Sequence, residues 1–293
     1  MTRPDASYRS FDPITSPGAH IDLYENAPGD PKNVSAEVQG LILHEHWAKA
    51  YGQTLTPERI AEVHLRSVEV ILDALLAHDK SPLRVARPPE LRVIGNCRDF
   101  TLMSVAALRS REVPARARCG FGSYFNAGTF EDHWVVEYWH ERRSAWQLFD
   151  AQLDALQVAA LKPDFNVLDV PRNRFITGGQ AWADCRAGRG DPMAFGIFDM
   201  RGQWFIAGDL IRDAAALTNK VMLPWDCWGM MNTYGSNETP IAEADLAFLD
   251  RLAELTADPD RHFHELHDLM ESDERVRVPD QVFNAIVQRM DTL

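Results

Sequence analysis

The stretch GNCRDFTLMSVAALRSRE, residues 95–112, is the part of the sequence that most strongly indicates the fold and the chemistry. Its apolar residues recur at helical spacing: Phe100, Met103, Ala106 and Ala107. This spacing predicts an α-helix over residues 98–111, with Cys97 directly before it. A helix N-terminus carries unpaired backbone N–H groups and about half a positive charge, and both favour a thiolate over a thiol. Cys97 is therefore a candidate nucleophile, and the same N–H groups can hold an oxyanion.

Three strands are predicted after this helix, at residues 115–119, 132–140 and 145–150, and aromatic and β-branched residues dominate the second. A polar turn near residues 141–144 joins the last two strands. Antiparallel pairing across that turn joins residues whose numbers sum to about 285. His133 and Asp150 sum to 283, so they are expected nearly opposite each other, where the carboxylate can orient the imidazole toward a thiol.

Together these motifs resemble the transglutaminase-like superfamily over about residues 90–155. The segments that carry the resemblance are GNCRDF at 95–100, EVPAR at 112–116, Gly120-Phe121, DHWVVE at 132–137, and Trp146 before Asp150. The resemblance implies that Cys97, His133 and Asp150 form the catalytic triad of a papain-like fold. Asn96, next to the thiol, is the candidate side chain for the oxyanion hole.

The order of a helix followed by consecutive strands predicts an α+β fold. We expect a transglutaminase-like, papain-like core in which the helix that carries Cys97 packs on an antiparallel sheet. The predicted organisation has three parts: an irregular N-terminal arm at 1–34, the catalytic core at 35–162, and an extension at 163–293 with mixed strands and helices. The other predicted elements are helices near 35–51, 56–77, 241–255 and 279–290 and strands at 194–198 and 203–207.

Three tryptophans are candidates for substrate binding. Trp134 follows the predicted base directly, where members of the superfamily often have a small residue in between. Trp225 and Trp228 lie in the segment LPWDCWG, residues 223–229, which could wall an acyl-binding cleft. For each of them, packing in a hydrophobic core is the alternative.

The composition of the chain narrows the possible classes of function and the possible cellular location. With 30 Lys and Arg against 43 Asp and Glu among 293 residues, the net charge is −13. This acidity argues against nucleic-acid binding. Four cysteines without a CxxC pair predict neither a disulfide framework nor a structural zinc site. No export signal and no membrane-spanning run are recognisable, so a reducing, cytoplasmic location is expected. The motifs require no cofactor.

The sequence therefore predicts thiol-dependent acyl transfer or amide hydrolysis through an acyl-enzyme on Cys97. The expected substrate is a small-molecule or peptide acyl group, with a carrier-bound thioester as one donor, and the oligomeric state stays open. The alternative is a catalytically inactive transglutaminase-like module that binds or scaffolds a partner. A metal hydrolase using His262, His264 and His267 is a third option, but the last two are spaced i, i+3, whereas the zinc-helix motif needs i, i+4.

Overall fold

The computed structural model describes residues 6–25 and 27–293, so residues 1–5 and 26 of the predicted N-terminal arm lie outside it. The chain divides into two compact units. The first runs up to Ala117 and resumes over Val135–Val170, and the second comprises Arg118–Trp134 and Pro171–Leu293. The chain thus passes between the units more than once. The division into an arm at 1–34, a core at 35–162 and an extension at 163–293 stays a prediction.

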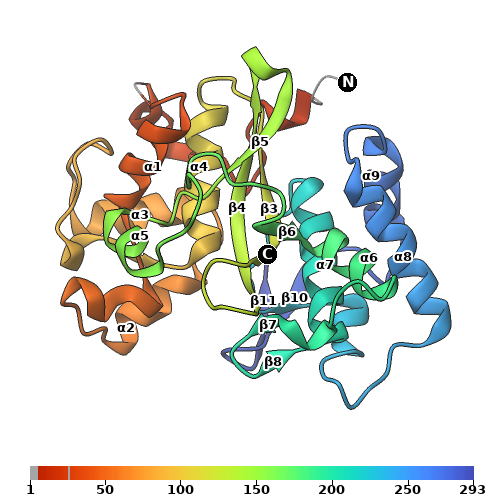
Figure 1. The fold of residues 1–293 in the computed structure, drawn as a ribbon. Helices are drawn as coiled ribbons and strands as arrows, with labels where there is room; N and C mark the ends of the chain where they lie inside the picture. The colour runs from red at the N-terminus through yellow and green to blue at the C-terminus, as the bar shows by residue number, and fades with distance from the viewer. Residues whose placement is uncertain (1–5, 26) are drawn as a thin grey trace. The chain divides into compact units, whose positions relative to one another are not determined.

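The first unit contains all the described helices that precede residue 117, together with two that follow strand β4 (Figure 1). Its α-helices are α1 Pro31–Gln39, α2 Pro57–Ile60, α3 Val68–His78, α4 Cys97–Arg109 and α5 Ala155–Leu161. Its 3₁₀ helices are η1 Ala6–Tyr8, η2 Gly18–Tyr24, η3 Glu45–Tyr51, η4 Ala61–His64, η5 Pro89–Leu91 and η6 Glu141–Arg143. Its strands are β1 Ile42–His44, β2 Val93–Gly95 and β5 Ala145–Phe149, and strands β3 Ala115–Gly122 and β4 Phe130–His140 run through both units.

Two strand pairs organise the first unit. Strands β1 and β2 pair in parallel, from Ile42↔Val93 to His44↔Gly95. Strands β4 and β5 pair antiparallel, from Val136↔Phe149 to His140↔Ala145, so paired residue numbers sum to 285 as predicted. The short turn over η6 sets this register, because it lets β5 return directly along β4.

Helix α4 is buried along its whole length, and its charged side chains form ion pairs. Arg98 donates to the carbonyls of Leu65 and Arg66, and Arg109 pairs with Asp12 at 2.6 Å. Because buried charges are costly without partners, these contacts are what allow a helix with charged residues on its polar side to lie inside the unit.

The second unit packs α-helices against short strands. Its helices are α6 Gly178–Arg186, α7 Gln203–Leu217, α8 Glu243–Ala257 and α9 Phe263–Ser272, with 3₁₀ helices η7 Pro192–Ala194 and η8 Gly229–Asn232. Its own strands are β6 Phe175–Thr177, β7 Phe195–Ile197, β8 Met200–Arg201, β9 Asp226–Cys227, β10 Gln281–Asn284 and β11 Arg289–Thr292. The strand order is β6-β3-β4-β7-β8, and β9, β10 and β11 form a separate sheet.

Helix α7 lies at the centre of this second unit, with α6 and α8 packed beside it (Figure 1). Its apolar residues join Phe121, Trp182 and Leu249 in one hydrophobic core. Strand β7 pairs parallel with β4, whereas β6 pairs antiparallel with β3. The mixture of helices with mostly antiparallel strands agrees with the predicted α+β class, although the predicted sheet was antiparallel throughout.

Several element predictions were wrong. Residues 203–207 begin helix α7 rather than a strand, and the predicted helix at 279–290 is the hairpin of β10 and β11. The helix expected over 56–77 is interrupted, because Ser67 caps a new helix, α3, by accepting from the Val70 N–H. The helix expected near 35–51 contains strand β1.

Among the described residues, no helix combines the length and the apolar composition needed to cross a lipid bilayer.

Candidate active site

Cys97 is the first residue of helix α4, whereas the sequence predicted it directly before the helix. Strand β2 ends at Gly95, and Asn96 is the N-cap. A reciprocal capping box closes the helix start: the Arg98 N–H donates to Asn96 Oδ1 at 3.0 Å, and the Asn96 N–H donates to Asp99 Oδ2 at 3.0 Å. The cap fixes the backbone around the thiol, so the helix N–H groups near Cys97 are held in place.

Gly95 is required by the close approach of strand β2 to the first turn of α4. A Cβ atom on this residue would lie 2.8 Å from Asp99 Oδ2 and 3.0 Å from Ile42 Cγ2. Both distances are shorter than ordinary van der Waals contact. The glycine in the GNC motif therefore permits the capping box that positions Cys97.

Asn96 carries a donor that the surrounding protein does not use. The side chain is 5% exposed, and within the described part of the chain its Nδ2 has no hydrogen-bond partner. A buried amide without a partner is costly in a folded protein, and such groups need an explanation. An oxygen that becomes negatively charged only during a reaction would be a suitable acceptor.

Asp150 lies directly after strand β5 and is fully buried. Its N–H donates to the Val167 carbonyl at 2.8 Å, and its Oδ1 accepts from the Gln152 N–H at 3.0 Å. These bonds hold the carboxylate in a defined orientation in the first unit.

His133 lies on the part of β4 that belongs to the second unit, and it is 2% exposed. Aromatic rings surround its imidazole: Phe125 at 4.8 Å, Tyr124 at 5.9 Å and Phe175 at 6.5 Å between ring centroids. Cys97 and Asp150 belong to the first unit and His133 to the second. The convergence of the three residues stays a prediction.

The three candidate tryptophans differ in exposure. Trp134 and Trp228 are each 1% exposed, and the Trp228 indole N–H donates to the Val276 carbonyl at 2.8 Å within the core of the second unit. Trp225 is partly exposed. Of the three, Trp225 has the most surface that a ligand could reach, and a role in binding stays a prediction for all three.

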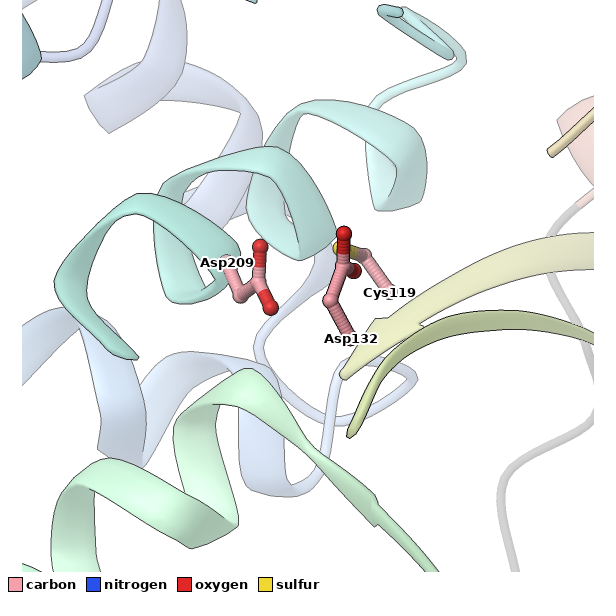
Figure 2. Close-up of side chains that lie close together, drawn as sticks. All are labelled: Cys119, Asp132 and Asp209. Atoms are coloured by element: carbon pink, nitrogen blue, oxygen red, sulfur yellow. The ribbon is translucent and has the colours of Figure 1, made fainter. Parts of the chain in front are cut away.

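The structure also brings together Cys119, Asp132 and Asp209, a cluster that the sequence did not reveal (Figure 2). One ligand atom from each of the three lies within 4.8 Å of the others. Asp132 and Cys119 come from neighbouring strands and Asp209 from α7 (Figure 2). The sequence did not indicate that Asp209 lies beside Cys119 and Asp132, because residues 203–207 at the start of α7 were predicted to form a strand.

Burial favours the protonated forms of the acidic groups in this cluster. Burial raises the pKa of Asp132 to about 6, and burial together with Asp132 raises the pKa of Asp209 well above its usual range. Arg212 donates to Asp209 Oδ1 at 3.2 Å and so already supplies a positive charge beside the carboxylates. Burial also raises the pKa of the Cys119 thiol well above its usual range.

The segment that contains the three candidate catalytic residues also matches a known protein family. Residues 59–151 match the Transglutaminase-like superfamily, and the match includes Cys97, His133 and Asp150. This confirms the resemblance that the motifs indicated. The comparison with curated proteins gives no match.

Two solved structures are similar to this chain at low identity. A protein from Cytophaga hutchinsonii described as a putative cysteine protease is 16% identical, with a TM-score of 0.34 over 58% of this chain and 44% of that one. Red sea bream transglutaminase is 17% identical, with a TM-score of 0.30 over 50% of this chain and 30% of that one. The similar region thus spans less than half the length of either protein.

Proposed function

We propose that this protein is a thiol enzyme that forms an acyl-enzyme on Cys97 and passes the acyl group to water or to an amine. The observation that carries the proposal is the position of Cys97 at the first residue of a capped, buried helix, directly after the unpartnered amide of Asn96. The helix start favours the thiolate, and the amide offers a donor to the oxyanion. The superfamily match over the same residues supports this reading.

The proposed reaction has two halves. In the first, His133 takes the proton of Cys97, the sulfur attacks the carbonyl carbon, and the carbonyl electron pair moves onto oxygen. The oxyanion collapses, a thioester forms, and the leaving amine or thiol takes the proton from His133. In the second half, water or an amine loses a proton to His133 and attacks the thioester, and Cys97 leaves with that proton. Asp150 orients the imidazole in both halves.

The proposed substrate is a small-molecule or peptide acyl group, with a carrier-bound thioester as one donor. Trp225 is the proposed contact for the acyl chain, because it is the most exposed of the three candidate tryptophans. Neither a nucleic acid nor a membrane takes part in the proposed reaction.

The proposal is tested by intact-mass spectrometry of the protein after incubation with a pool of thioesters and amides. We expect one covalent adduct, with the mass of an acyl group from the pool, that maps to Cys97 and disappears in Cys97→Ala. The adduct mass would also identify the donor.

Cys185→Ala is the matched control, because burial raises the pKa of that half-buried thiol to about 11 and makes it a poor nucleophile. We expect the control to keep the adduct. If no acyl donor modifies Cys97, and Cys97→Ala keeps the cellular function of the protein, the proposal fails and the binding or scaffolding module takes its place.

A further inference from the structure

The cluster of Cys119, Asp132 and Asp209 lies wholly within the second unit and joins three of its elements. Cys119 is on β3 and Asp132 on β4, which are neighbouring strands of one sheet, and Asp209 is on α7. Figure 2 shows the three side chains pointing toward one another between these strands and the helix. One ligand atom from each lies within 4.8 Å of the others, so a single small ion can contact all three.

The carboxylate oxygens of this cluster are not all used by the protein. Asp209 is 1% exposed and its Oδ1 accepts from Arg212, whereas its Oδ2 is buried without a hydrogen-bond partner among the described residues. Asp132 Oδ1 is likewise buried without a partner there. A buried acceptor that meets no donor is costly. Two carboxylates this close therefore need a shared proton or a cation between them, because two bare negative charges repel each other.

The charges in and around the cluster suit a divalent cation. When ionised, the thiolate and the two carboxylates carry three negative charges, and Arg212, which pairs with Asp209 at 3.2 Å, supplies one positive charge. The adjacent Asp213 does not change this sum, because both of its oxygens accept from Arg118, at 2.9 and 2.8 Å. A cation with two positive charges therefore brings the buried group to neutrality.

We propose that Cys119, Asp132 and Asp209 bind one Zn²⁺ ion. The mixed donor set decides the metal, since a thiolate selects zinc over magnesium and calcium, and zinc also accepts carboxylates. Neighbouring ligand atoms of a tetrahedral zinc ion lie about 3.5 Å apart, so the three groups need only a small contraction. The ion displaces the protons that these groups otherwise hold. Three protein ligands leave a fourth position for water, and Asp132, the partly exposed member, provides access to it.

The role of this zinc ion is structural. It links β3 and β4 to α7, and so holds together elements that are far apart in the sequence. Successive side chains of a strand point to opposite faces, so Asp132 faces the ion and the next residue, His133, faces the other side of β4. The ion therefore stabilises the second unit without contacting that imidazole.

The test uses the full chain, freed of metal by dialysis against EDTA, with Zn²⁺ alone added at pH 8. Competition with a chromophoric zinc chelator measures stoichiometry and affinity, and thermal unfolding measures stabilisation. We expect wild type to bind one ion per chain and to unfold at a higher temperature with zinc. Asp132→Asn and Asp209→Asn should each weaken binding at least about 100-fold, since each loses a direct ligand. Zinc-free Asp132→Asn should fold, because the substitution removes one of two carboxylates that repel each other, and circular dichroism checks this.

Cobalt(II) shows whether the thiol is a ligand. Co²⁺ occupies zinc sites, and a cobalt–thiolate bond adds an intense charge-transfer absorption in the near ultraviolet. We expect this absorption in wild type and its loss in Cys119→Ser. Cys185→Ser is the matched control, because it removes a half-buried thiol of the same unit that lies outside the cluster, and it should keep the absorption. Cys97→Ala should also keep the absorption and the zinc stoichiometry.

Three results would overturn the zinc site. If wild type binds no zinc, the two carboxylates share a proton only. If folded Asp132→Asn and Asp209→Asn bind zinc as tightly as wild type does, the ion lies elsewhere in the chain. If Cys97→Ala loses the ion, the metal belongs to that thiol. None of these results depends on whether Cys97 forms an acyl-enzyme, so the zinc site and the proposed function fail separately.

Discussion

Arg116 and Glu137 form a buried ion pair in the first unit, with 2.7 Å between Nε and Oε2 and side chains at most 2% exposed. The guanidinium also lies over the Trp146 ring, 3.9 Å from its centroid. Arg116 belongs to the EVPAR motif and Glu137 to the DHWVVE motif, so the pair ties together the strands that carry both.

Glu137→Ala should destabilise the protein by about 3–5 kcal/mol, because it leaves the Arg116 guanidinium buried without its counter-charge. Urea unfolding followed by circular dichroism measures this change. Glu254→Ala is the control: it removes the carboxylate of an exposed pair with Arg251, so it should cost less than about 1 kcal/mol. Equal costs for the two variants would contradict the role given to the buried pair.

The sequence predicted the part of the fold in which local pattern and tertiary structure agree. Residues 97–150 have a helical period, then alternating strands and one tight turn, and the register sum of 285 followed from that turn alone. The start of α4 beside Cys97 was predicted to within one residue, whereas the capping box of Asn96 and Asp99 that fixes this start was found only in the structure.

Elsewhere the local pattern was misleading for identifiable reasons. Helix α7 is buried from Phe205 to Leu217, and its first turn has the bulky apolar residues WFIA at 204–207, which resemble a strand. Residues 281–292 have apolar positions at helical spacing, but pairing of Phe283 with Cys227 on β9 draws them into a sheet. The Asp132–Asp209 cluster depends on that misread helix.

Gly95→Ala should lower both stability and the reactivity of Cys97. The added methyl group would enter the space of Asp99 and Ile42 and displace the capping box, at a cost of about 1–3 kcal/mol. Thermal unfolding and iodoacetamide labelling at neutral pH measure the two effects. Gly29→Ala, whose added Cβ meets only ordinary contacts at 3.5 Å, should change neither by a comparable amount. An alanine at 95 that leaves labelling intact would show that the cap does not position the thiol.

Two substitutions at Asn96 separate its cap from its proposed donor. Serine can still cap the helix, so Asn96→Ser should keep stability, whereas Asn96→Ala should lose about 1 kcal/mol. Both lack the Nδ2 donor, so both should slow acylation by p-nitrophenyl acetate about 100-fold. Iodoacetamide alkylation of Asn96→Ser should stay near wild type. Normal acylation in Asn96→Ser would remove Asn96 from the oxyanion hole.

The Asp132–Asp209 cluster predicts a pH-dependent stability. Because burial raises the pKa of Asp132 to about 6, the folded protein binds this proton more tightly than the unfolded chain does. The contribution of Asp132 therefore favours folding fully below about pH 4 and is lost as the pH rises through 6. Asp132→Asn should match wild type near pH 4 and be more stable at pH 8, by on the order of 1–2 kcal/mol.

Urea unfolding at pH 4, 6 and 8 measures the difference between these two proteins. Asp199→Asn, at an exposed position in the same unit, should show no such trend. If Asp132→Asn is less stable than wild type at pH 8, the prediction is wrong. The attraction of Arg212 for the ionised Asp132 carboxylate would then exceed the free-energy cost of burying that charge.

The most direct measurement is the rate at which iodoacetamide labels each cysteine at neutral pH, read by peptide mapping. Cys97 at the start of α4 should react faster than a free thiol, and Cys119 and Cys185 more slowly, because burial raises the pKa of both. Labelling of Cys97 at or below the rate of a free thiol would contradict the account.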